Sequence, residues 1–169
     1  MKKLLLLLII PFLSFGQGWE QIFCDYYIGN SVQQTTDGGY IITGVTGFVG
    51  SDVVLLKTNS NGEEEWSQTF GEEENIGPGW NEDFGHTVQQ TTDGGYIICG
   101  ITNSFDGEFA ACLIKTNGNG QEEWVQTFPG YTGTIFAGSG PRTSVQQTID
   151  GGYILCGGNL ALGLSLIHI

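Results

Sequence analysis

Short apolar runs bounded by turn residues dominate this chain. In the first clear example, Val32–Thr35 and Tyr40–Thr43 flank the triplet Asp37-Gly38-Gly39. Glycine readily adopts the positive φ that a tight hairpin turn needs. The pattern therefore predicts two antiparallel strands joined by this turn.

A second hairpin follows directly. Residues 52–58 form an apolar, β-branched run, and residues 63–70 follow the turn sequence Asn59-Ser-Asn-Gly62. Together with the first hairpin, these segments predict an antiparallel meander of four short strands. The inner runs are continuously apolar and do not alternate, which is typical of a sheet covered on both faces.

The whole pattern then recurs. The segment 31–44 returns as 87–100 and again as 144–157, at spacings of 56 and 57 residues. The block 55–70 matches 113–128 in step with it. Repeats of this length are typical of propellers, solenoids and arrays, in which each unit buries its surface against its neighbours.

We therefore predict an all-β chain, a fragment of a β-propeller built from four-stranded antiparallel blades. Repeat one covers 31–70, repeat two covers 87–128, and a third begins at 144–157. A β-sandwich is the alternative, although it does not require so regular a recurrence. Residues shared by the repeats are expected to be structural anchors: Trp19, Trp66, Trp124, Gly38, Gly39, Gly94, Gly95, Gly151 and Gly152.

The N-terminus carries two predictions. Residues 1–16 combine a basic start, an apolar core and small residues before Gln17, which predicts a cleaved signal peptide and a secreted or cell-surface protein. Residues 19–23 then repeat the Trp-x-x-x-Phe spacing of the fourth strands. We expect an orphan fourth strand there, of the kind that completes the last blade of a closed ring. The partial propeller would then occupy residues 17–163.

The C-terminal hexapeptide, residues 164–169, resembles the translation of a transposon-type sequencing adapter. We interpret it as an artefact, in which case His168 has no biological role and the ring lacks blades from its own chain. A genuine hydrophobic C-terminus is the alternative. Either way, two full repeats and part of a third are fewer than the roughly four to eight blades of a closed propeller.

Charge narrows the range of partners. The chain has a net charge of −13, and without the leader three basic side chains oppose 18 acidic ones. Nucleic-acid binding depends on basic patches, so we expect neither a nucleic-acid partner nor a membrane after signal cleavage. The Glu runs 63–65, 72–74 and 122–123 could bind a divalent ion, but such runs are more often solvated faces that keep a strand edge from pairing with a neighbour.

Cysteine and other chemistry-bearing residues give weak signals. Cys99 and Cys156 replace Thr43, and Cys112 replaces Val54, which favours free core thiols; a Cys99–Cys112 bridge stays open. The Asn-x-Asn-Gly segments lack the glutamate of a calcium loop. We predict no catalytic residue, no metal site and no cofactor.

The repeat motif Val-Gln-Gln-Thr-x-Asp-Gly-Gly-Tyr-Ile-Ile, with Leu-Ile-Lys-Thr-Asn and Trp-x-x-Thr-Phe, resembles repeats of large exported proteins of Bacteroidetes-type bacteria. That resemblance implies a secreted repeat protein, often with a type IX secretion sorting domain. A fainter similarity to quinoprotein propellers rests on the pairs Gly62/Trp66 and Gly120/Trp124. The quinoprotein Asp-x-x-Thr-Gly turn is missing, so no quinone cofactor is expected.

Two functions fit these observations. The first is a non-enzymatic binding or scaffold module for a glycan, a protein or a cell-wall polymer. The second is the propeller part of an extracellular enzyme, polysaccharide-degrading or quinone-dependent, with its catalytic residues in missing blades. Ligand contacts are expected in the loops where the repeats diverge. The candidates are Trp80, Asp83, His86, Phe105 and Asp106, and packing of Trp80 onto its own blade is the alternative.

Overall fold

The chain folds into strands and turns. The computed structural model describes residues 18–23, 27–47, 51–71, 82–103, 109–128, 143–159 and 163–169. These residues contain no helix, and hence none that could cross a membrane.

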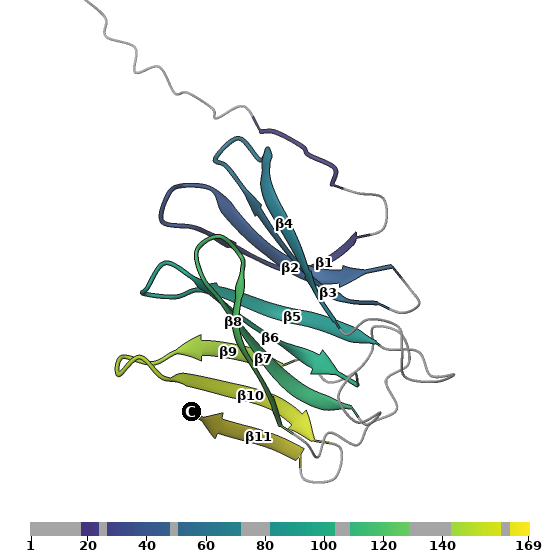
Figure 1. Ribbon diagram of the computed structural model, residues 1–169, viewed down its shortest axis with the longest axis vertical. Coiled ribbons are helices and arrows are strands. Elements are labelled where there is room, and N and C mark those ends of the chain that lie inside the picture. The colour runs from purple at the N-terminus through teal and green to yellow at the C-terminus, as the bar shows by residue number, and fades with distance from the viewer. Residues whose placement is uncertain are drawn as a thin grey trace, which may run out of the picture.

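The strands form three antiparallel sheets, which we call the first, second and third blade (Figure 1). The first blade comprises β1 (Tyr27–Gln34), β2 (Tyr40–Thr46), β3 (Val53–Thr58) and β4 (Glu64–Phe70). The second comprises β5 (Asp83–Gln90), β6 (Tyr96–Thr102), β7 (Ala110–Thr116) and β8 (Glu122–Phe128). The third comprises β9 (Ser144–Gln147), β10 (Tyr153–Asn159) and β11 (Gly163–His168).

This architecture confirms the predicted fold class. Strand order in the two complete blades follows chain order, β1-β2-β3-β4 and β5-β6-β7-β8, as a meander requires. All residues of β3, β6 and β7 are buried, which explains why these strands read as continuous apolar runs. Each blade thus covers its neighbour in the manner of a propeller.

The first strand of each complete blade begins earlier than predicted. β1 starts at Tyr27 and β5 at Asp83, whereas the sequence suggested starts near Val32 and Thr87. The pairing register shifts between Gly29 and Ser31, and again between Gly85 and Thr87. A bulge of this kind breaks the regular pairing along a strand, so the earlier half resembled a loop.

The core lies between the blades. Each blade has a front face, which carries Lys57 and Trp66 in the first blade, and a rear face, which carries Tyr96 and Val88 in the second. The front face of the first blade packs on the rear face of the second, with Ile41 and Leu55 buried at this interface.

The second and third blades repeat that contact. The front face of the second blade packs on the rear face of the third. The buried residues of this interface are Ile97, Cys99, Ile101, Ala111, Leu113, Val145, Tyr153 and Leu155. Full burial of one large apolar side chain contributes about 1.5–3 kcal/mol to stability. These two interfaces are therefore the main stabilising contacts.

The third blade uses the C-terminal residues as its third strand. β11 pairs with β10, with His168 opposite Ile154, and so takes the position of β3 and β7. Residues 163–168 therefore take the place of a third strand in this blade. The adapter origin of the segment stays a prediction.

Candidate functional site

Identical turns close one end of every blade. Thr35, Thr91 and Thr148 each donate their backbone N–H to the carbonyl of a glycine four residues later, at 2.9 Å in all three cases. The turns Asn59–Glu63 and Asn117–Gln121 lie at the same end, each held by the Asn side chain. We call this the turn end; in Figure 1 the β1–β2, β5–β6 and β9–β10 hairpins of this end point to the left.

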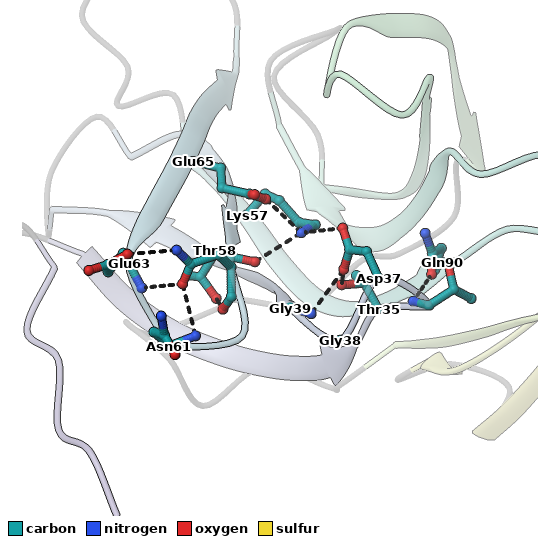
Figure 2. Close-up of polar contacts among 12 residues, drawn as sticks. Thr35, Asp37, Gly38, Gly39, Lys57, Thr58, Asn61, Glu63, Glu65 and Gln90 are labelled. Carbon is teal, nitrogen blue, oxygen red and sulfur yellow. Dashed lines mark hydrogen bonds and ion pairs between the residues drawn. The ribbon is translucent and has the colours of Figure 1, made fainter.

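A buried lysine ties the turn end together in each of the first two blades, as Figure 2 shows for Lys57. Lys57 Nζ lies 2.9 Å from Asp37 Oδ2, 2.7 Å from Glu65 Oε2 and 2.9 Å from the carbonyl of Thr58. The lysine is buried on the front face of the blade, while both carboxylates reach solvent. The second blade repeats the arrangement with Lys115, Asp93 and Glu123.

The electrostatics show that these lysines are structural. Burial alone would lower the pKa of Lys115, but hydrogen bonds to Glu123 and Asp93 outweigh it and raise the pKa above its usual value. Hydrogen bonds from Thr91 and Lys115 lower the pKa of Asp93 to about 2. The lysine is therefore charged near neutral pH and is not available as a base or nucleophile.

The last glycine of each turn makes room for the lysine. A Cβ on Gly39 would lie 2.1 Å from the carbonyl oxygen of Thr58 and 2.7 Å from Lys57 Nζ. A Cβ on Gly95 would lie at the same distances from the carbonyl oxygen of Thr116 and from Lys115 Nζ. The preceding glycines have a different role, since Gly38 and Gly94 have φ of 86° and 85°. The Gly-Gly doublet thus combines a turn conformation with close approach.

Glutamine side chains bridge neighbouring blades. Gln33 Oε1 accepts from the backbone N–H of Gln90 at 2.6 Å, and Gln90 Oε1 accepts from the N–H of Thr36 at 2.9 Å. Gln89 and Gln147 form the equivalent bonds between the second and third blades. Backbone groups of the neighbouring blade thus satisfy these glutamine side chains.

The repeated tryptophans also act between blades. Trp66 packs on Tyr96 of the next blade, with ring centroids 5.8 Å apart, and Trp124 packs on Tyr153 at the same distance. A Cβ on Gly120 would lie 2.5 Å from the Trp66 ring, so this glycine provides the seat for the tryptophan. Both rings therefore lie between neighbouring blades, and their role as packing anchors stays a prediction.

The bulge residue of the first strand forms a further contact that the sequence did not reveal. Asn30 in the first blade donates to the carbonyl of Gly85 in the second at 2.8 Å. His86 occupies the equivalent position in the second blade, and its Nδ1 accepts from the backbone N–H of Thr143 at 3.1 Å. His86, predicted as a ligand contact, therefore joins the second and third blades. The only sequence signal for this contact was position. The residues involved stand directly before Ser31, Thr87 and Ser144, where each copy of the repeated segment begins.

The bases of the divergent loops meet at the opposite end, which we call the loop end. Asp83 donates its backbone N–H to the carbonyl of Ser51 at 2.7 Å, and Ser51 forms a parallel bridge with Glu82. Glu82 in turn donates its N–H to Asn103 Oδ1 at 2.7 Å. Segments of two blades, more than 50 residues apart in sequence, are thereby joined.

Asp83 lies inside this junction. Its exposed fraction is 3%, and a Cβ on Gly71 would lie 2.1 Å from Asp52 Oδ1 and 3.0 Å from Asp83 Oδ2. Both carboxylates therefore face the same glycine at the end of β4. This geometry supports a role for Asp83 in holding the first two blades together, and a contact to ligand stays a prediction.

The remaining predicted ligand residues, Trp80, Phe105 and Asp106, lie outside the described residues. The described strands nevertheless place the segments that lead into them at one end of the stack. Residues 103 and 109 flank one divergent loop, and residues 71 and 82 flank another. The described residues that flank the two loops therefore lie at the same end of the blades.

The cysteines do not form the bridge that the sequence left open. Cys99 lies opposite Leu113 on the front face, whereas Cys112 lies opposite Gly100 on the rear face, so the two side chains point to opposite sides of the sheet. Cys99, Cys112 and Cys156 are free thiols. Burial raises the pKa of Cys99 to about 12, which leaves the thiol unreactive near neutral pH.

Among the described residues, no group of three or more His, Cys, Asp or Glu side chains is placed to hold a metal ion. Neither a model of a known protein family nor a curated protein sequence matches the chain. The geometry of the blades is therefore the basis for assigning a function.

Proposed function

We propose that this protein is an exported, non-enzymatic propeller that serves as a binding or scaffold module, with its ligand held at the loop end. One observation carries the proposal: residues that recur between repeats are engaged in packing and hydrogen bonds, while the described residues that flank the divergent loops lie at one end of the blades. Lys57 illustrates the contacts within a blade, and Trp66 and Gln33 illustrate those between neighbouring blades.

The chemistry of the divergent segments favours a glycan, with a protein or a cell-wall polymer as the other ligand classes. Residues 71–86 and 100–109 combine aromatic and acidic residues, including Trp80, Phe105 and Asp106. An aromatic ring can stack on a sugar ring, while a neighbouring carboxylate accepts hydrogen bonds from its hydroxyl groups. Loops on a rigid scaffold commonly carry such contacts.

The export route belongs to the same proposal. The repeat motif is similar to that of exported Bacteroidetes-type proteins, and a type IX sorting domain is the expected companion. The basic start and apolar core of residues 1–16 support cleavage before Gln17. Intact-mass measurement of the protein recovered from the culture medium tests this step; an uncleaved N-terminus on protein retained in the cell would contradict it.

Binding is tested with Trp80→Ala, measured by retention on a panel of immobilised polysaccharides and by thermal melting. We expect lost retention with an unchanged melting temperature. Trp66→Ala is the matched control, because Trp66 packs between blades and its loss lowers the melting temperature. A large drop in melting temperature for Trp80→Ala would assign Trp80 to packing. Failure of the parent protein to bind any polysaccharide, protein or cell-wall polymer would contradict the proposal.

A further inference from the structure

Two hairpins of the turn end place an asparagine directly before a glycine. Asn61-Gly62 lies in the turn between β3 and β4, and Asn119-Gly120 lies in the turn between β7 and β8. Asparagine is a thermolabile residue, because the backbone nitrogen that follows it can attack its side-chain carbonyl carbon. Glycine shields that nitrogen least, since it carries no side chain. Both pairs therefore have the local chemistry of a deamidation site.

The second blade contains two such pairs in one turn, and the structure treats them differently. Asn117 precedes Gly118 just as Asn119 precedes Gly120. Asn117 Oδ1 accepts from the backbone N–H groups of Asn119 at 2.9 Å and Gln121 at 3.1 Å, and its Nδ2 donates to Gln121 Oε1 at 3.0 Å. The Asn119 side chain is exposed and forms no hydrogen bond with any described residue. Only Asn117 is held in place.

The first blade repeats the contrast. Asn59 Oδ1 accepts from the backbone N–H groups of Asn61 at 2.9 Å and Glu63 at 3.1 Å, and its Nδ2 donates to Glu63 Oε2 at 2.7 Å. Asn61, labelled in Figure 2, is exposed, and within the described part of the chain its side chain has no hydrogen-bond partner. Asn59 is followed by Ser60, so Asn61 is the asparagine of this turn that precedes a glycine.

The attacking nitrogen is held by one turn bond. The N–H of Gly62 donates to the carbonyl of Asn59 at 3.1 Å, and the N–H of Gly120 donates to the carbonyl of Asn117 at 3.0 Å. Exposed turns open locally at a small cost in free energy. Asn119 thus becomes reactive once a single bond opens, whereas three side-chain bonds restrain Asn117.

The aspartate-glycine pairs of the other hairpins are protected in a different way. Aspartic acid forms the same ring by releasing water, which requires a protonated carboxyl group. Hydrogen bonds from Thr91 and Lys115 lower the pKa of Asp93 to about 2, so this carboxyl group is ionised near neutral pH. Asp37 has the same contacts with Thr35 and Lys57. The exposed asparagines are therefore the reactive members of the turn end.

We propose that Asn61 and Asn119 are modification sites, at which asparagine converts to aspartate and isoaspartate without an enzyme. At the second site the Gly120 nitrogen gives up its proton to solvent and bonds to Asn119 Cγ, while the Cγ–Nδ2 bond breaks and the side-chain nitrogen leaves as ammonia. Water then opens the succinimide ring. Cleavage of the new bond to Cγ gives aspartate, and cleavage of the bond to the backbone carbonyl carbon gives isoaspartate.

The modification has a structural consequence, because the glycine of each pair lies against a tryptophan of the preceding segment. A Cβ on Gly120 would lie 2.5 Å from the Trp66 ring, and one on Gly62 would lie 2.3 Å from the Trp19 ring. Isoaspartate lengthens the main chain by one methylene group directly before the glycine. At Asn119 this displaces Gly120 from Trp66 and so loosens the contact between the first and second blades.

The first test incubates the purified chain in mildly alkaline buffer and locates the products by peptide mapping and tandem mass spectrometry. We expect conversion about tenfold or more faster at Asn119 than at Asn117, since each additional neutral hydrogen bond is worth a factor of about five. The same chain unfolded in urea is the control, and there both asparagines should convert at equal rates because each precedes a glycine. Equal rates in the folded protein, or faster conversion at Asn117, would overturn the proposal.

The second test compares Asn119→Gln with Asn61→Gln during the same incubation. Glutamine would have to form a six-membered ring, which closes far more slowly. We expect the parent protein and Asn61→Gln to accumulate isoaspartate at position 119 and to lose melting temperature with time, while Asn119→Gln keeps its melting temperature. Isoaspartate is measured by labelling with an isoaspartyl methyltransferase. A parent protein without isoaspartate, or an Asn119→Gln variant that loses melting temperature as fast as the parent, would overturn the assignment.

Discussion

The two ends of the blade stack differ in what their residues do. At the turn end, the first two blades repeat the same polar contacts, with Lys57 and Lys115 each 2.9 Å from an Asp carboxylate. At the loop end, contacts such as Asp83 to Ser51 and Glu82 to Asn103 join segments whose sequences differ between repeats. The comparison teaches that recurrence in this chain marks packing, whereas the divergent segments are the ones that we propose for binding.

The largest effect is expected for Gly95→Ala at the turn end. Its Cβ would meet the backbone carbonyl of Thr116 at 2.1 Å and Lys115 Nζ at 2.7 Å. Backbone must move, so we expect a loss of about 3 kcal/mol or more in the free energy of unfolding. Gly94→Ala is the control; nothing lies within 4 Å of its Cβ, and only its φ of 85° opposes the change. Urea unfolding should show a loss of about 1 kcal/mol in the free energy of unfolding for Gly94→Ala. Equal losses for the two variants would contradict the close-approach role.

Trp66→Ala should have the next largest effect. Removing the ring takes away its contact with Tyr96 and leaves a gap above Gly120. Because Trp66 is half-buried, we expect a loss of about 2 kcal/mol in the free energy of unfolding, below the range for fully buried aromatic residues. Trp66→Phe should recover part of the loss. Thermal melting measures both, and an unchanged Trp66→Ala melting temperature would break the link between recurrence and packing.

Gln89→Ala should cost about 1 kcal/mol, since the N–H of Gln147 loses its acceptor between the second and third blades. Gln34→Ala is the matched control within one chain. Gln34 forms only a long bond to its own turn, so its removal should leave unfolding in urea nearly unchanged. A loss at Gln34 equal to that at Gln89 would show that the glutamines act within blades.

The smallest effect concerns pH. The pKa of Asp93 is lowered from 3.8 to about 2 in the fold, first by the hydrogen bond from Thr91 and then by Lys115, so these contacts stabilise the protein above about pH 4 and their contribution disappears as the pH falls to about 2. Asp93 is more than half exposed, which keeps the effect modest. The melting temperatures of the parent and Asp93→Asn should differ above pH 4 and converge near pH 2. A constant difference down to pH 2 would rule out a role for the ion pair.

Much of the turn end could be predicted from sequence because its signals are local. The Asp-Gly-Gly and Asn-x-Asn-Gly segments specify their own turns, and recurrence identified Trp66 as an anchor. The buried lysine cluster was missed, although a lysine recurring within an apolar strand was its signal. Lys57 needs Asp37, 20 residues away, and Glu65 across a hairpin, and both partners depend on strand register.

The contacts between blades were harder to predict from the sequence than the turns. Gln33 meets Gln90 only because two sheets stack in one relative position, and no local pattern encodes that position. The bulges at Gly29 and Gly85 disguised the starts of β1 and β5 for a similar reason. As a result, Asp83 and His86 were taken as loop residues, although both lie on β5.

The contrast between the two ends is tested most directly by exchanging a divergent loop and measuring the melting temperature. Residues 104–109 would be replaced by residues 48–51, the shorter loop at the same position in the first repeat, with Asn103 and Ala110 retained. The account predicts a melting temperature within about 3 °C of the parent protein, since loops tolerate such changes far better than packed contacts do. A drop as large as that caused by Gly95→Ala would show that the loop end holds the fold together, and would contradict the account.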